Sequence, residues 1–196
     1  MAGGLARVYG GDKAVSVMVF FSAKRRSEHE AAERVYAACR DAARRPALFL
    51  AYGVPDTFQG RFEMLALALF PVLNRLMHEP GDDPALARLV SESLVDDMDA
   101  VFREMGVSDP AVPKRMKTLY SSFAGRIAAY REALGGSEEA LAEAVARNVF
   151  PDDPPDHRAA PLAAYLKAAT ETVAVADIAA LRRGEIPFPD LGPART

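Results

Sequence analysis

The sequence has few of the residues that usually build chemical sites. Its 196 residues include one cysteine, three histidines and no tryptophan. A single cysteine, Cys39, can form neither an internal disulfide nor a cysteine-based zinc site, so we expect a small buried side chain in a cytoplasmic protein. The histidines are far apart and form no HxxxH or HExxH pattern, and the sequence therefore predicts no histidine metal site.

A strong excess of one charge is also lacking. Lys and Arg total 24 against 27 for Asp and Glu, a net charge of −3, which argues against a general nucleic-acid binder. The carboxylates of Glu92, Asp96 and Asp99 fall on one helix face by their spacing, and they could hold a cation or pair with basic residues. No histidine or fourth acid accompanies them at the spacing of di-iron sites. We therefore expect a salt-bridged or solvated face.

Motifs of catalysis and nucleotide binding are absent as well. The sequence contains no GxSxG turn, no GxGxxG loop and no GxxxxGK[ST] loop. These are the patterns that place a nucleophile or a phosphate group at the start of a helix. We expect no cofactor, and we predict that the chain is not an enzyme.

The apolar stretch at residues 14–23 is too short to cross a membrane, since a spanning helix needs roughly 20 apolar residues. Basic residues 24–26 follow it, whereas those of a signal peptide precede the apolar run. The stretch could rest on an anionic membrane surface or pack on the domain. Met18 is a candidate start of translation. We divide the chain into an N-terminal extension at 1–26, a helical domain at 27–183 and a proline-containing tail at 184–196.

Helix-forming residues dominate the composition, and aromatic residues make up only 8%. Composition and helical spacing together predict an all-α fold, a single-domain bundle of about six to seven helices. Ser27 and Glu30 form a capping box at the start of the first helix. Residues 58–78 are the most apolar segment, and we expect a buried central helix that Pro71 kinks or divides. The predicted helices span residues 27–45, 58–78, 85–105, 114–134, 138–150 and 162–183.

Three groups of residues stand out from this background, and the first spans residues 52–64 (YGVPDTFQGRFEM). Asp56 or Thr57 can cap the helix that begins here. Gly60 leaves room for a close neighbour. Arg61 projects from an otherwise apolar helix, so it needs a carboxylate partner or a functional role.

The second group is Asp96 to Asp99 (DDMD) followed by residues 103–107 (REMGV). The third is residues 112–117 (VPKRMK), followed by Gly125, Arg126 and Tyr130. The arginines could pair with Asp99 or Glu104 and fix the helix register.

Three cations of the third group, Lys114, Arg115 and Lys117, lie at a helix start, where the positive end of the helix dipole disfavours them. Their side chains could simply be exposed to water at the start of the helix. The unfavourable electrostatic energy of these cations is more easily understood if an anionic partner binds there.

Together and in this order, the motifs GVPDTxxGRF, DMD with REMGV, and VPKRMK with GR and Y closely resemble the ubiquinol-cytochrome c chaperone family. The resemblance covers roughly half of the chain. It implies an all-α domain that binds newly made cytochrome b and keeps it competent for assembly into respiratory complex III. It also suggests a cytoplasmic protein with possible peripheral contact with the inner membrane.

We predict that an apolar groove holds a hydrophobic client segment while nearby charge orients it. The residues that we expect to bind the client or partner are Phe58, Arg61, Phe62, Lys114, Arg115 and Lys117. The residues that we expect to maintain the structure are Asp56, Gly60, Asp99, Arg103, Glu104, Gly106, Gly125, Arg126 and Tyr130. The alternative is a helical adaptor that binds another soluble protein or the inner membrane surface, with no role in complex III.

Overall fold

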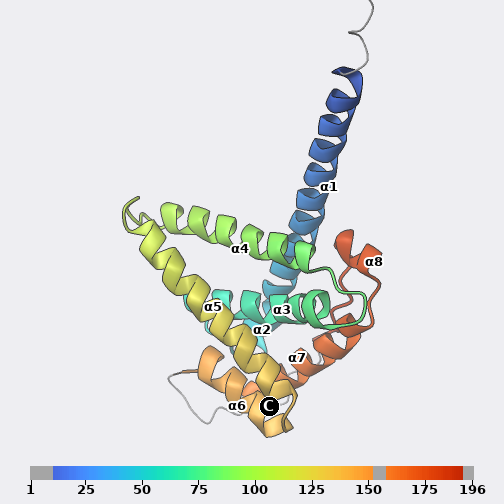
Figure 1. Cartoon of the computed structure of the whole chain (residues 1–196). Helices are drawn as coiled ribbons and strands as arrows, with labels where there is room; N and C mark the ends of the chain where they lie inside the picture. Colours follow the sequence, from blue (N-terminus) through green and yellow to red (C-terminus); the bar gives the residue numbers. More distant parts are fainter. Residues whose placement is uncertain (1–10, 152–157, 192–196) are drawn as a thin grey trace, which may run out of the picture.

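The computed structural model describes residues 11–151 and 158–191, with side chains from residue 24 onward, and every regular element in that part is an α-helix (Figure 1). Six longer helices and two five-residue helices confirm the predicted all-α bundle. The elements are α1 (Gly11–Ala43), α2 (Pro46–Leu50), α3 (Phe58–His78), α4 (Pro84–Glu104), α5 (Val112–Leu134), α6 (Glu138–Val149), α7 (Ala159–Ala174) and α8 (Ile178–Arg182).

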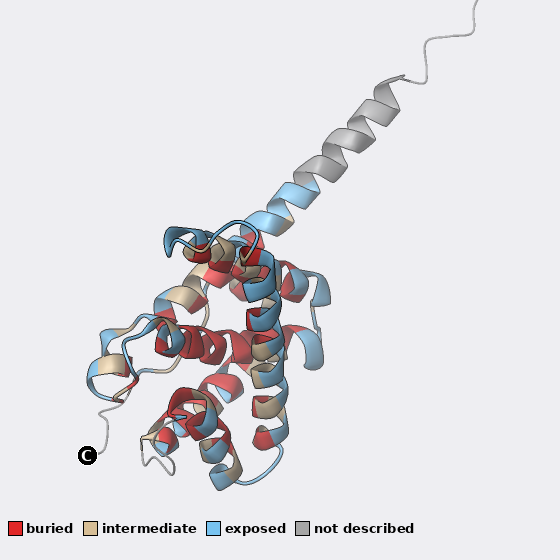
Figure 2. Cartoon of the chain, turned by 90° about the vertical axis from the view of Figure 1, so that its left-hand side faces the viewer, coloured by how far each residue is buried: buried red, intermediate tan, exposed pale blue. Residues whose placement is uncertain are grey.

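Helix α3 lies at the centre of the bundle, where α1, α4, α5, α6 and α7 pack against it (Figures 1 and 2). Most of its residues are buried, because its apolar residues surround the helix rather than forming one stripe. Pro71 does not divide it: one helix runs from Phe58 to His78. Pro71 is itself buried, and packing on all sides offsets the hydrogen bond that the proline removes.

Helix α1 does not begin at Ser27, and the prediction of a capping box there is wrong. The helix already includes residues from Gly11 onward, and Ser27 lies inside it with an exposed side chain. Glu30 pairs instead with Arg26, one turn earlier, with 2.9 Å between Oε1 and Nε. The expectations for the apolar stretch at 14–23 and for Met18 lie outside the described side chains. Cys39 is buried as predicted, and burial raises the pKa of its thiol.

Three of the other predicted helix starts are confirmed by their hydrogen bonds, whereas α5 and α7 begin before the predicted residues 114 and 162, at Val112 and Ala159. The side chains of Thr57, Asp83 and Ser137 accept from the backbone N–H three residues on, at 3.1, 3.1 and 3.3 Å. Gly106, just after α4, has a φ of 77°, a left-handed conformation that glycine adopts without strain.

The last predicted helix is wrong in one respect, because it is two helices. Helix α7 ends at Ala174, and the side chain of Asp177 accepts from the backbone N–H of Ala179 at 3.2 Å to begin α8. The described part of the tail packs back on the bundle, where Phe188 is partly buried and Arg45 donates to the carbonyl of Pro189 at 3.0 Å. Residues 152–157, and residues 192–196 of the predicted tail, lie outside the described part.

No helix in the described ranges is long and apolar enough to cross a membrane.

Gly60 is required by a close approach of two backbone segments. A Cβ placed on Gly60 would lie 1.9 Å from the carbonyl oxygen of Pro55, which real Cβ atoms do not approach so closely. The loop before α3 therefore packs directly on the first turn of the helix, as the sequence predicted. Gly125, in α5, has no such neighbour within 4 Å.

We expect Gly60→Ala to destabilise the protein by about 2 kcal/mol or more, because the loop must move away from α3. Gly125→Ala is the matched control. It places the same methyl group in open space inside a helix, and we expect it to stabilise by about 0.5–1 kcal/mol. Urea denaturation followed by circular dichroism measures both. Equal midpoints for Gly60→Ala and wild type would refute the close-packing interpretation.

Candidate functional site

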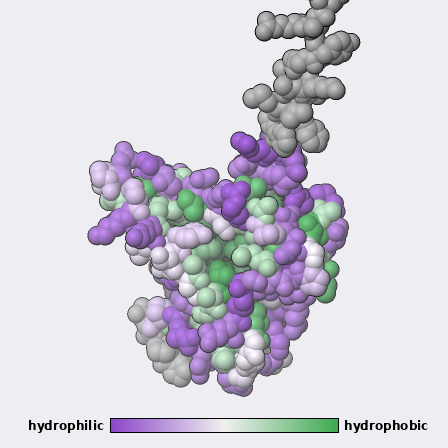
Figure 3. Space-filling model, viewed as in Figure 1, coloured by the Kyte–Doolittle hydropathy of each residue, from purple (hydrophilic) through white to green (hydrophobic). Residues whose placement is uncertain are grey.

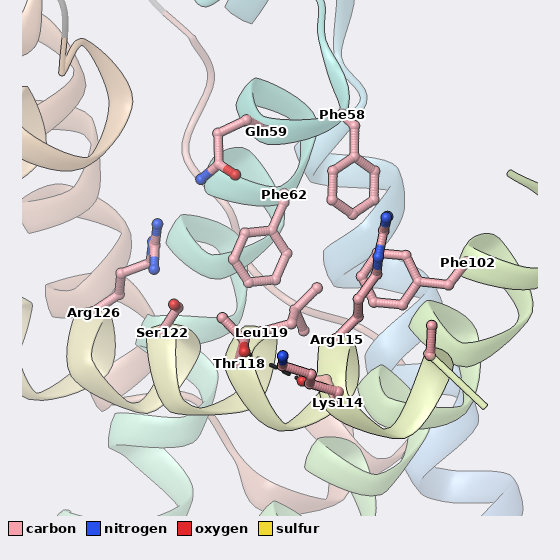
Figure 4. A pocket seen from close by; sticks show the side chains of 11 residues that line it. Phe58, Gln59, Phe62, Phe102, Lys114, Arg115, Thr118, Leu119, Ser122 and Arg126 are labelled. Atoms are coloured by element: carbon pink, nitrogen blue, oxygen red, sulfur yellow. Dashed lines mark hydrogen bonds between the residues drawn. The ribbon is translucent and has the colours of Figure 1, made fainter. Parts of the chain in front are cut away.

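A groove of about 460 Å³ lies between the start of α3 and the first half of α5, and Phe102 of α4 closes one side (Figure 4). We call it the Phe groove. It brings together four of the six residues predicted to bind a client: Phe58, Phe62, Lys114 and Arg115. Its full lining is Phe58, Gln59, Phe62, Phe102, Ala111, Lys114, Arg115, Thr118, Leu119, Ser122 and Arg126.

The apolar part of the groove comes from three helices. Phe58 and Phe62 lie one turn apart on the same face of α3, and both point into the groove (Figure 4). The rings of Phe58 and Phe102 have centroids 5.6 Å apart and are tilted by 41°. Leu119 contributes from α5 and is 8% exposed. Aromatic rings offer a large apolar contact area with little freedom to lose, which suits them to bind another apolar surface.

Two cations lie at the rim without compensation. Lys114 and Arg115 are exposed in the first turn of α5. That turn contains no acidic residue, and no side-chain cap bonds the start of the helix. Within the described ranges, neither side chain makes a hydrogen bond or an ion pair. The Thr118 hydroxyl donates to the backbone carbonyl of Lys114 at 3.2 Å, and this bond does not involve the Lys114 ammonium. The rim therefore carries a positive charge that no neighbouring carboxylate balances.

The third cation of the groove, Arg126, is fully paired with Glu63 of α3. Its Nε and Nη2 donate to the two carboxylate oxygens, each at 2.5 Å. Glu63 has no exposed side-chain surface, and Arg126 is 13% exposed. Gln59 also donates to Glu63, and the Arg126 guanidinium lies 5.4 Å from the centroid of the Phe62 ring. Burial raises the pKa of Glu63, and Arg126 and Gln59 counter this by stabilising the carboxylate.

Pairing Arg126 with Asp99 or Glu104, as the sequence suggested, is therefore wrong. The true partner was missed, although a single carboxylate within the most apolar segment is a signal that a basic residue must meet it there. Arg126 of this pair lies at the end of the Phe groove opposite Arg115 (Figure 4).

Two of the predicted binding residues lie outside the Phe groove. Arg61 pairs with Asp56, with 2.6 Å between Nε and Oδ1, and its guanidinium lies 5.5 Å from the Phe49 ring centroid. Asp56 is thus the carboxylate partner that we expected for Arg61. Lys117 lines another groove, described next. A role for Arg61 and Lys117 in binding stays a prediction.

The second groove, of about 600 Å³, lies between α4 and α5 on the face that Figure 3 shows, where apolar surface gathers in a hollow. We call it the α4–α5 groove. Met77, Met116, Lys117 and Tyr120 contribute to it. Tyr120 is 46% exposed. The side chain lies on the groove wall because α5 is covered on fewer sides than α3.

The acidic segment of α4 forms ion pairs, as expected. Asp99 accepts from Arg103, with 2.7 Å between Oδ2 and Nε, and Arg103 also contacts Asp109. Asp97 accepts from the Tyr36 hydroxyl at 2.6 Å and joins α4 to α1. Burial and this hydrogen bond raise the pKa of Tyr36. Among the described residues, no cluster of three or more His, Cys, Asp or Glu could hold a metal ion.

Of the other residues that we expected to maintain the structure, Tyr130 makes a contact between helices, whereas Glu104 and Gly125 do not. Tyr130 is fully buried and meets the ring of Phe70 edge-on at 5.8 Å, which ties α5 to α3. Glu104 is exposed and forms no ion pair with any described residue. Gly125 meets no neighbour that would require a glycine.

We expect Arg126→Ala to destabilise the protein by about 3–5 kcal/mol, because it leaves the Glu63 carboxylate buried without its cation. The double variant Glu63→Leu/Arg126→Met removes both charges and should regain most of that loss. Arg103→Ala, which breaks an exposed pair, should stay near the wild-type midpoint. Denaturation midpoints test all three. A double variant no more stable than Arg126→Ala would contradict the assignment.

Comparisons with known proteins place this arrangement in a family. The model of the family described as ubiquinol-cytochrome C chaperone matches residues 50–188. The mouse and human proteins named ubiquinol-cytochrome c reductase complex assembly factor 1 are each 28% identical to this chain over 120 residues. The match takes in 61% of this chain but 41% and 40% of those proteins, so the chain spans about two-fifths of their length.

A solved structure has the same fold. The crystal structure of the Cbp3 homolog from Brucella abortus matches with a TM-score of 0.79 at 35% sequence identity, over 89% of this chain and 97% of that one. The family match spans both walls of the Phe groove, from Phe58 in α3 to Arg126 in α5. Because it covers well over half of the sequence, this chain belongs to the ubiquinol-cytochrome c chaperone family.

Proposed function

We propose that this chain is an assembly chaperone for respiratory complex III, and that the Phe groove binds a segment of newly made cytochrome b. Family membership and the names of the mouse and human relatives support the first part. The Phe groove supports the second, because its walls are built from two of the motifs by which the sequence resembles the family. That coincidence of motif and groove is the observation on which the proposal rests.

The groove suits a client whose apolar surface is exposed before assembly. Phe58 is partly buried at the groove, and the buried rings of Phe62 and Phe102 line it behind Phe58. A client side chain that enters the groove removes its own apolar area and part of the groove's area from water, and this stabilises the complex. No bond is made or broken in such a step. The chaperone would hold the segment until its final partners in complex III replace the groove.

We also propose that the protein acts in the cytoplasm, with peripheral contact at the inner membrane, where a membrane-embedded client would be met. Lys24 and Arg25 are exposed on α1, and neither forms an ion pair with a described residue. Basic residues at such a site are attracted to anionic lipid headgroups.

A photo-cross-linking residue placed in the groove tests contact with the client directly. At Lys114 or Thr118, both exposed on the groove wall, we expect an adduct that contains cytochrome b after irradiation of living cells. The control position is Thr172, which is exposed on α7 and outside the groove. Cytochrome b recovered equally from all three positions, or from none, would refute binding in the Phe groove.

Loss of the gene separates the chaperone from the adaptor. We expect its deletion to lower cytochrome b and assembled complex III, because unprotected client is degraded. The wild-type chain and Thr172→Trp should restore both, whereas Thr118→Trp, which fills the groove, should not. Quantitative immunoblots and native gels measure the outcome. Unchanged complex III in the deletion strain would favour the adaptor instead.

A further inference from the structure

The charge balance of the Phe groove points to the chemistry of its occupant. Three cations line it: Lys114, Arg115 and Arg126. Glu63 compensates Arg126 through two hydrogen bonds of 2.5 Å. No carboxylate is among the residues that line the groove, and the other two cations have no acidic partner in the described part of the chain. The free protein therefore keeps two uncompensated positive charges, from neighbouring residues of α5, along the wall of an apolar groove.

These charges are unfavourable for the chain on its own. Lys114 and Arg115 are neighbours in sequence, and the helix start beneath them adds a further partial positive charge. Many arginines elsewhere in the described chain each contact a carboxylate, among them Arg61, Arg103, Arg182 and Arg183. An anionic group on a bound partner would supply what the free chain lacks.

We propose that the Phe groove binds an apolar polypeptide segment that carries an acidic residue, and that Lys114 and Arg115 bind its carboxylate. This inference rests on the proposed function, which makes the occupant a polypeptide. Figure 4 shows the order of contacts along the groove: Arg126 lies toward one end, Phe62 and Lys114 lie nearer the middle, and Arg115 lies toward the other end beside Phe58 and Phe102. The apolar side chains of the segment lie over the Phe62 and Leu119 side chains, and its carboxylate faces the rim.

The pattern also fixes where the acidic side chain of the segment lies along the groove. The buried pair of Arg126 and Glu63 is neutral and already satisfied, so it offers no charge to an acidic side chain. Only the part of the wall at Lys114 and Arg115 attracts one. Charged rims of this kind set the orientation and the association rate of a partner, whereas the apolar contacts supply most of the affinity.

The test uses the purified full chain and fluorescent peptides that tile the cytochrome b of the same organism. Peptides that bind are compared in pairs that differ only by Glu→Gln or Asp→Asn. We expect acidic peptides to bind, and their amides to bind about tenfold more weakly or worse, because each loses a charge-assisted hydrogen bond. High salt should abolish the difference within each pair.

Variants of the chain assign the effect to the rim. Lys114→Glu/Arg115→Glu should lose the preference for the acidic peptide and should bind a Glu→Lys peptide better than wild type does. Lys114→Arg/Arg115→Lys should keep the preference. The control Arg147→Glu/Arg183→Glu makes the same change in net charge at exposed positions outside the groove, and it should behave as wild type.

Three outcomes would overturn the inference, and they are distinguishable. If acidic and amide peptides bind equally and Thr118→Trp abolishes the binding of both, the groove binds the client without discriminating its charge, and the proposed function stands. If no peptide binds in a way that Thr118→Trp abolishes, binding of cytochrome b in the groove fails as well. If vesicles with anionic phospholipid bind through Lys114 and Arg115 while peptides do not, the rim is a lipid site.

Discussion

The buried ion pair between Glu63 and Arg126 is the interaction on which the candidate site depends. It places a carboxylate of the central helix against a guanidinium of α5, and both are largely removed from water. Removal of either partner would leave an unpaired buried charge, so the two helices are held in one register. The pair also holds Arg126 at one end of the Phe groove, near the face of Phe62. One contact thus both holds α3 against α5 and positions a residue that lines the candidate site.

The pair explains why the three cations of the groove differ in role. Arg126 is satisfied within the fold and acts as a structural residue, which agrees with its predicted role although its partner differs. Lys114 and Arg115 lie beyond the reach of Glu63 and are left for a partner. An apolar groove with uncompensated charge on part of its wall favours a hydrophobic segment whose acidic residue meets that charge, a preference that a wholly apolar groove does not have.

Much of this could be predicted from the sequence, because the relevant signals are local. Thr57 and Asp83 mark helix starts by their own hydrogen bonds, and the apolar content of residues 58–78 requires burial. The close approach at Gly60 follows from a glycine in a helical turn beside a proline loop. The Phe groove was anticipated by residue type, since Phe58, Phe62, Lys114 and Arg115 were assigned together.

What escaped prediction depends on contacts between distant segments. Glu63 and Arg126 are 63 residues apart, and no local pattern says which of several arginines reaches the buried carboxylate. The capping box at Ser27 is a valid local signal that a longer helix overrides. Likewise, Asp177 starts a new helix within a segment whose apolar spacing continues across the break. Lys117 was grouped with Lys114 by sequence, but it lines the other side of α5.

The central claim is that the Phe groove, rather than another face, receives the client. Amide hydrogen exchange of the full chain, with and without bound cytochrome b segment, tests it most directly. We predict new protection in the first turns of α3 and in α5 from Val112 to Arg126, with α6 and α7 unchanged. Protection of the walls of the α4–α5 groove at Met77 and Ser91, with the first turns of α3 unchanged, would contradict it.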